Sequence, residues 1–93
     1  MHFEWDKNQI NEDKHNISFD EAQNVFFDKH RIIAKDDDHS TDKEIRYFCF
    51  GKIDDAVVTV RFTMRDSNIR IIGAGYWRKR KKIYEEANKE KGD

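Results

Sequence analysis

Apolar residues occupy every second position in the middle of the chain, over residues 56–65. The apolar set is Val58, Val60, Phe62 and Met64. A period of two is typical of a β-strand, because successive side chains point to opposite faces of a sheet. The pattern predicts a strand that places this set in a core, with Arg61 and Arg65 together on the other face.

Four further segments have the composition of strands. They are residues 3–5, 31–35, 44–52 and 69–72. Turns are predicted at residues 51–55 and 66–68, because these clusters are rich in Gly, Asp, Ser and Asn. Gly73-Ala74-Gly75 is expected to end the last strand, and residues 36–43 are expected to form a polar loop.

Three segments show helical spacing. Asp6 is a candidate N-cap for a helix over residues 7–15. Ser18 and Glu21 form a capping box before an amphipathic helix over residues 19–27. A third helix is expected over residues 76–89, with basic residues on its outer face. Its apolar stripe would consist of Tyr76, Ile83, Tyr84 and Ala87.

The order of these elements predicts a compact α+β fold in a single domain, residues 1–93. An N-terminal strand and two helices come first. A mainly antiparallel meander sheet follows, and a basic helix ends the chain.

Composition agrees with a folded domain. Charged residues make up 40% of the chain, which favours disorder, but the 13% of aromatic residues are large apolar groups that need burial. Cys49 lies in an apolar run, so a buried, inert thiol in a reducing compartment is expected, with a catalytic cysteine as the alternative. The chain has no apolar run near the roughly twenty residues of a membrane span and no signal-peptide pattern, so a cytoplasmic protein is expected.

Positive charge is concentrated in residues 61–82. This segment contains eight Lys or Arg residues and one Asp, although the whole chain has a net charge of −1. A local cationic surface collects phosphates whatever the overall charge. The alternative is a solvated helix face that keeps a small domain soluble.

Arginines in this segment suggest a chemistry. Arg61, Arg65 and Arg70 are predicted on two adjacent strands, and Arg78 begins the following helix, so the four could converge on one phosphate. RNA cleavage without a metal needs a proton acceptor for the 2′-hydroxyl, a proton donor for the leaving 5′-oxygen, and cations for the phosphorane. Arginine suits the last role, because its planar guanidinium group donates paired hydrogen bonds to phosphate oxygens.

Three other clusters have two interpretations each. Lys14 and His15 could hold a phosphate and exchange protons, or His15 could cap the end of the first helix. Glu44 and Arg46 share one strand face and could be a base and a clamp, or a surface ion pair. The segment 36–39, Asp-Asp-Asp-His, could bind a divalent metal or form a solvated acidic loop.

Aromatic residues could stack on RNA bases. The candidates are Trp5, Tyr47, Tyr76 and Trp77. Most of them are expected in the core. Tyr76 and Trp77 are the better candidates for stacking, because they lie beside the basic helix.

Several motifs match a known family in the right order and over nearly the whole chain. They are Phe3-Glu4-Trp5-Asp6, Lys14-His15-Asn16-Ile17-Ser18-Phe19-Asp20-Glu21-Ala22, Val25-Phe26, Asp28, Asp38-His39-Ser40, Glu44-Ile45-Arg46-Tyr47, Gly51, Ile69-Arg70-Ile71-Ile72-Gly73-Ala74 and Ile83-Tyr84-Glu85. The sequence resembles the BrnT toxin family. The motif of residues 14–22 is the most specific part.

The resemblance implies a ribonuclease toxin of a type II toxin–antitoxin system, with a RelE-like α+β fold, that blocks translation and arrests bacterial growth. It also implies a BrnA-type antitoxin with a ribbon-helix-helix part, a 2:2 heterotetramer, and contact with operator DNA only through the antitoxin. The motif positions are Lys14, His15, Glu44, Arg46, Arg65, Arg70 and Tyr84. Many relatives have Ser and Arg where this chain has Gly73 and Gly75.

Motifs and basic segment together lead to the expectation of an RNA endonuclease that uses no metal and no cofactor. The catalytic candidates are Arg65, Arg70, His15 and Glu44. The RNA-binding candidates are Lys14, Arg46, Arg61, Tyr76, Arg78 and Lys79. His15 or Glu44 would accept the proton, and Lys14, His15 or Tyr76 would donate one. The alternative is an inactive module of the same fold that binds RNA or a protein.

Overall fold

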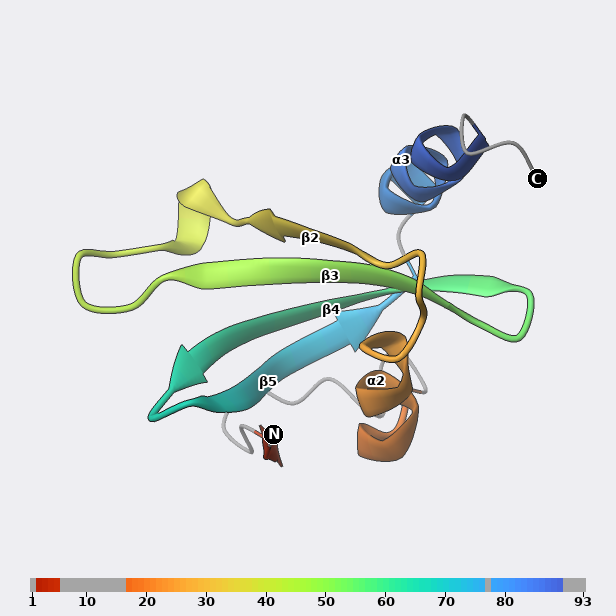
Figure 1. The fold of residues 1–93 in the computed structure, drawn as a ribbon. Coiled ribbons are helices and arrows are strands. Elements are labelled where there is room, and N and C mark those ends of the chain that lie inside the picture. The colour runs from red at the N-terminus through yellow and green to blue at the C-terminus, as the bar shows by residue number, and fades with distance from the viewer. Residues whose placement is uncertain (1, 6–16, 77, 90–93) are drawn as a thin grey trace.

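A five-stranded sheet with a helix on each face forms the molecule (Figure 1). The computed structural model describes residues 2–5, 17–76 and 78–89, with the side chains of 78–80 left out. The elements are β1 (Phe3–Trp5), α2 (Phe19–Val25), β2 (Ile32–Lys35), a short 3-10 helix η1 (Asp37–His39), β3 (Arg46–Ile53), β4 (Ala56–Arg65), β5 (Asn68–Gly75) and α3 (Arg78–Lys89). The α+β class is confirmed.

The sheet has the strand order β1-β5-β4-β3-β2 and is mixed. Strands β2 to β5 form the predicted antiparallel meander. Strand β1 pairs in parallel with β5, Phe3 opposite Ile69 and Trp5 opposite Ile71, so the sheet is mainly antiparallel, as expected, with one parallel edge pair. This pairing places Phe3 and Trp5 against the main hydrophobic core.

One N-terminal helix is described, α2, where two were predicted. The predicted helix over residues 7–15 lies outside the described residues. The capping box at the start of α2 is confirmed: Ser18 Oγ accepts from the Glu21 N–H at 3.1 Å, and Glu21 Oε1 accepts from the Ser18 N–H at 2.9 Å. The helix ends at Val25 rather than at residue 27, and Phe27 is exposed to solvent.

The main core lies between the sheet and α2. It includes Ile17, Ala22 and Val25 from the helix side and Val58, Val60 and Phe62 from β4. Most of the predicted apolar set of β4 is therefore buried. Met64 is 44% exposed, because it lies at the end of β4 that α2 does not reach (Figure 1).

The opposite sheet face is covered at one end by α3. Tyr84 packs there with Phe50 and Val57. The predicted apolar stripe of α3 was wrong, because Ile83 and Ala87 are exposed. The helix approaches the sheet along a narrow line through Tyr84 and Asn88, and the Asn88 side-chain amide donates to the His30 carbonyl at 3.3 Å.

Asp28 fixes the position of α3. Its carboxylate accepts hydrogen bonds from the Tyr84 hydroxyl, from the Lys52 N–H at 2.7 Å and from the His30 N–H at 2.8 Å. Burial acts to raise the pKa of Asp28, but these hydrogen bonds outweigh it and the pKa lies below its usual value. Burial and the Asp28 carboxylate raise the pKa of Tyr84.

Strand β5 continues through Gly73 and Gly75 instead of ending before them. Gly73 lies opposite Arg61 and Gly75 opposite Thr59, and a register shift occurs next to Arg61. Pairing with β4 satisfies the backbone here, so the tertiary context outweighs the usual weakness of glycine in strands. No helix among the described residues is long and apolar enough to cross a membrane.

Candidate functional site

Helix α3 covers one end of a sheet face. At the other end of the same face, a row of residues crosses the sheet. Arg46 of β3 lies opposite Thr63 of β4, Thr63 lies opposite Arg70 of β5, and Arg70 pairs with Glu4 of β1. Opposed residues on neighbouring strands share a face. The row therefore presents two arginines with one strand between them.

Two more arginines flank Thr63 along β4. Arg61 and Arg65 are each two residues away, so they share its face. Thr63 is buried, and its hydroxyl donates to the Ile45 carbonyl at 2.7 Å. The predicted common face of Arg61 and Arg65 is confirmed, and Thr63 lies at the centre of a cluster of four arginines. We call Arg46, Arg61, Arg65 and Arg70 the arginine cluster.

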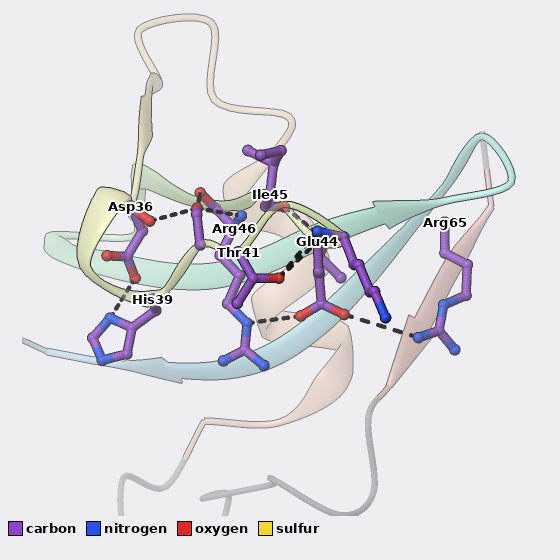
Figure 2. A network of polar contacts seen from close by, with 10 residues as sticks. Asp36, His39, Thr41, Glu44, Ile45, Arg46 and Arg65 are labelled. Atoms are coloured by element: carbon purple, nitrogen blue, oxygen red, sulfur yellow. Dashed lines mark hydrogen bonds and ion pairs between the residues drawn. The ribbon is translucent and has the colours of Figure 1, made fainter.

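Glu44 links two members of the cluster (Figure 2). Its Oε1 accepts from Arg46 Nε at 2.8 Å, and its Oε2 lies 3.9 Å from Arg65 Nη2. A short loop positions Glu44, because the Glu44 N–H donates to Thr41 Oγ1 at 3.1 Å and its carbonyl accepts from the Thr41 N–H at 2.8 Å. Both carboxylate oxygens of Glu44 thus face arginines.

The loop before β3 is tied to the backbone of Arg46. The Asp36 N–H donates to the Arg46 carbonyl at 2.7 Å, and the Arg46 N–H donates to Ser40 Oγ at 2.9 Å. Ser40 Oγ in turn donates to the Asp36 carbonyl at 2.6 Å. Within this loop, Asp36 Oδ2 lies 2.8 Å from His39 Nδ1. The arrangement places an Asp–His pair next to the start of β3 (Figure 2).

Part of the predicted site lies outside the described residues: Lys14, His15, Trp77 and the side chains of Arg78 and Lys79. Tyr76 directly follows β5 and is exposed, so its ring is open to a ligand. Trp5 and Tyr47 pack against the core, as was expected of most aromatics.

Within the described residues, no group of three or more His, Cys, Asp or Glu side chains is arranged to hold a metal ion.

Cys49 is a buried thiol, as predicted. Its side chain is fully enclosed, and burial raises its pKa to about 12. A thiol of this kind is not ionised near neutral pH and is a poor nucleophile. The burial and the raised pKa of Cys49 favour the expected inert thiol over a catalytic cysteine.

Two buried polar atoms on the site face have no hydrogen-bond partner within the described part of the chain. They are Arg61 Nε and Thr59 Oγ1. Each belongs to a β4 residue that lies opposite a glycine, Gly73 or Gly75. Gly73 and Gly75 therefore place no side chain across from these two polar groups, next to the arginine cluster.

Sequence reasoning treated Asp36 and His39 as a metal site or a solvated loop, and it missed that they pair. Asp37, Asp38 and His39 are exposed, as expected of a solvated loop, but Asp36 is buried and its backbone is bonded to that of Arg46. Their spacing of three residues was the available signal, since one turn of η1 brings such positions together.

The arrangement can bind a polyanion. Arginines on one sheet face can donate several hydrogen bonds to phosphate oxygens. The fold and the site together define a small α+β domain with an arginine-lined sheet face, a class suited to a phosphodiester chain.

The family comparison narrows this class. A family described as "Ribonuclease toxin, BrnT, of type II toxin-antitoxin system" matches residues 3–81. The chain belongs to this family, and the resemblance noted from its motifs is confirmed. Membership implies a cognate antitoxin as partner. A comparison with curated proteins found no match.

Proposed function

We propose that this ribonuclease toxin is a metal-independent endonuclease that cuts RNA by attack of a ribose 2′-hydroxyl on the neighbouring phosphate. The arginine cluster around Thr63 carries the proposal. Arg65 and Arg70 stabilise the phosphorane, and Arg46 and Arg61 hold the RNA backbone. Cleavage of RNA in the cytoplasm would block translation and arrest growth.

Glu44 was one of two candidates for the proton acceptor. Its contacts with Arg46 and Arg65 favour another role, because a carboxylate between two guanidinium groups is held as their partner. We assign Glu44 to the orientation of these two arginines. Tyr76 offers an exposed ring for base stacking. Lys14, Arg78 and Lys79 remain proposed RNA contacts, and His15 remains a proposed catalytic residue.

The test is cleavage of a single-stranded RNA by purified protein in EDTA. Arg65→Ala and Arg70→Ala should each slow cleavage by about 100-fold or more, as the loss of one transition-state donor does elsewhere. Arg31→Ala is the matched control, since this exposed arginine contacts the Asp28 carbonyl, away from the cluster. Equal cleavage by all variants would remove the cluster from the mechanism, and loss of wild-type cleavage in EDTA would point to a metal.

The antitoxin is proposed to be a BrnA-type protein with a ribbon-helix-helix part that forms a 2:2 heterotetramer and contacts operator DNA. We propose that an acidic segment of it covers the arginine cluster, which would neutralise the charge and block RNA together. In the complex, Arg65 and Arg70 should then become protected from arginine-modifying reagents. Unchanged reactivity would show that the antitoxin binds elsewhere.

A second candidate function is an inactive module that binds RNA or the antitoxin without cutting. The observation in its favour is Gly73 and Gly75, which leave the site face without the common Ser and Arg side chains. Induced expression separates the two candidates. Growth arrest that Arg70→Ala abolishes supports the nuclease, and a harmless protein that still binds its antitoxin supports the module.

A further inference from the structure

The Asp36–His39 pair has the geometry of a proton-transfer unit. Asp36 Oδ2 and His39 Nδ1 are 2.8 Å apart, and the Asp36 side chain is 6% exposed while that of His39 is 55% exposed. An ionised carboxylate only accepts hydrogen bonds, so this contact assigns the ring proton of neutral His39 to Nδ1. Nε2 then carries the lone pair, on a ring that solvent or substrate can reach.

The position of the pair is fixed relative to the arginine cluster. Three hydrogen bonds join Asp36 and Ser40 to each other and to the backbone of Arg46. Figure 2 shows the side chains of His39, Arg46 and Glu44 extending to the same side of this segment. A phosphate held by Arg46 would therefore have the imidazole nearby, on the side away from Arg65.

We propose that His39 is the general base of the reaction and that Asp36 is its positioning residue. The proposal rests on the proposed cleavage by 2′-hydroxyl attack. His39 Nε2 accepts the 2′-hydroxyl proton, and the Asp36 carboxylate stabilises the imidazolium that forms. Glu44, whose oxygens face Arg46 and Arg65, is not needed for this step.

The step balances without a further reagent. The 2′-oxygen forms a bond to phosphorus while the bond from phosphorus to the 5′-oxygen breaks, and the 5′-oxygen takes a proton from water. His39 then returns its proton to the solvent. The products are one RNA end with a 2′,3′-cyclic phosphate and one with a 5′-hydroxyl.

Among the described residues, the charged group that contacts the His39 imidazole is the Asp36 carboxylate. In its own segment, Asp37 is paired with Lys35 at 3.6 Å, and Asp38 is exposed. From β3, Arg46 extends to the same side of the segment.

The experiment compares single-turnover cleavage by the wild type, His39→Gln and Asp36→Asn from pH 5 to 9. His39→Gln should slow cleavage by about 100-fold or more and lose the acidic limb of the profile. Asp36→Asn should slow it less. Both should bind an RNA lacking 2′-hydroxyls as the wild type does, and should keep its unfolding midpoint. His30→Gln and Asp37→Asn are the matched controls, since His30 lies at the other end of β2 and Asp37 is an exposed neighbour.

Wild-type rates and an unchanged pH profile in His39→Gln would overturn the inference while leaving the proposed nuclease in place. Slow cleavage that is accompanied by an equal loss of RNA binding would overturn it as well, because His39 would then be a binding residue. A wild type that cuts no RNA, or leaves ends without a cyclic phosphate, would refute the proposed reaction and the role of His39 with it.

Discussion

Arg46 and Arg70 lie in the same row of the sheet, with only Thr63 of β4 between them. Neighbouring strands are about 4.8 Å apart, so the backbones of the two arginines are separated by about 10 Å. Side chains that start at this spacing from a common face can approach one phosphate from two sides. The row is fixed by strand pairing rather than by loops, which keeps the spacing constant.

The role of Glu44 can be tested by Glu44→Gln. The amide keeps the shape and one acceptor oxygen but loses the charge that faces Arg46 and Arg65. If Glu44 orients the arginines, cleavage should fall by less than about 10-fold, and RNA should bind more tightly because a negative charge has left the site. A fall of about 100-fold or more with unchanged binding would instead identify Glu44 as the base.

Two threonines of β4 should differ in their contribution to stability. Thr63→Val loses the 2.7 Å hydrogen bond to the Ile45 carbonyl and should lower the free energy of unfolding by about 1–2 kcal/mol. Thr59→Val removes a buried hydroxyl without a described partner, so it should be neutral or stabilising. Urea unfolding of both variants provides the measurement. A large loss in Thr59→Val would show that its hydroxyl is bonded, for example to water.

The Asp28–Tyr84 contact should make stability depend on acid pH. Asp28 has a pKa below its usual 3.8 in the folded state, so its contribution is complete above that pH and is lost as the pH falls through the folded value. Tyr84→Phe should lower the free energy of unfolding at pH 7 by about 1–3 kcal/mol and reduce the further loss between pH 4 and about pH 2.

Urea unfolding at several pH values measures the acid dependence of stability in the wild type and in Tyr84→Phe. Tyr76→Phe is the control, because the Tyr76 ring is exposed and residue 76 lies in no helix or strand. The contact would be unimportant if both variants lost stability equally and with the same acid dependence.

Basic residues of α3 should act on RNA capture more than on the chemical step. Lys81 and Lys82 are exposed, on the helix that covers the site face at one end. Their joint change to alanine should weaken RNA binding and reduce the slope of log K against log salt by up to about 1.4. Cleavage at saturating RNA should stay within about 3-fold of the wild type.

Lys89→Ala, an exposed lysine at the far end of α3, is the matched control for this pair. A slope equal to that of the wild type would show that the two lysines are only solvated.

The sequence predicted features that depend on local pattern. The period of two in β4 correctly placed Arg61 and Arg65 on one face, and Ser18 with Glu21 marked the start of α2. Features set by distant partners were missed. Gly73 and Gly75 stay in β5 because β4 pairs with them, and α3 buries Tyr84 but not Ile83 because it meets the sheet along a narrow line.

The site was partly predictable for the same reason. The alternation along β4 indicated that Arg61 and Arg65 share a face, but the pairing of β4 with β5 is what brings Arg70 to that face as well. The Asp36–His39 pair depends on a loop that is folded back by bonds to the Arg46 backbone. Side-chain direction in such a loop follows from those bonds rather than from a repeating pattern, so spacing alone did not distinguish this pair from a solvated acidic stretch.

The division of one sheet face between α3 and the arginine cluster has a practical consequence for producing the protein. A ribonuclease toxin harms the cell that makes it, which limits yield. The packing of Tyr84 on Phe50 and Val57 does not involve exposed Arg65. If Arg65 acts in cleavage as proposed, a host cell that makes the Arg65→Ala variant should accumulate folded protein without self-poisoning, and this material would suit crystallisation of the toxin without its antitoxin.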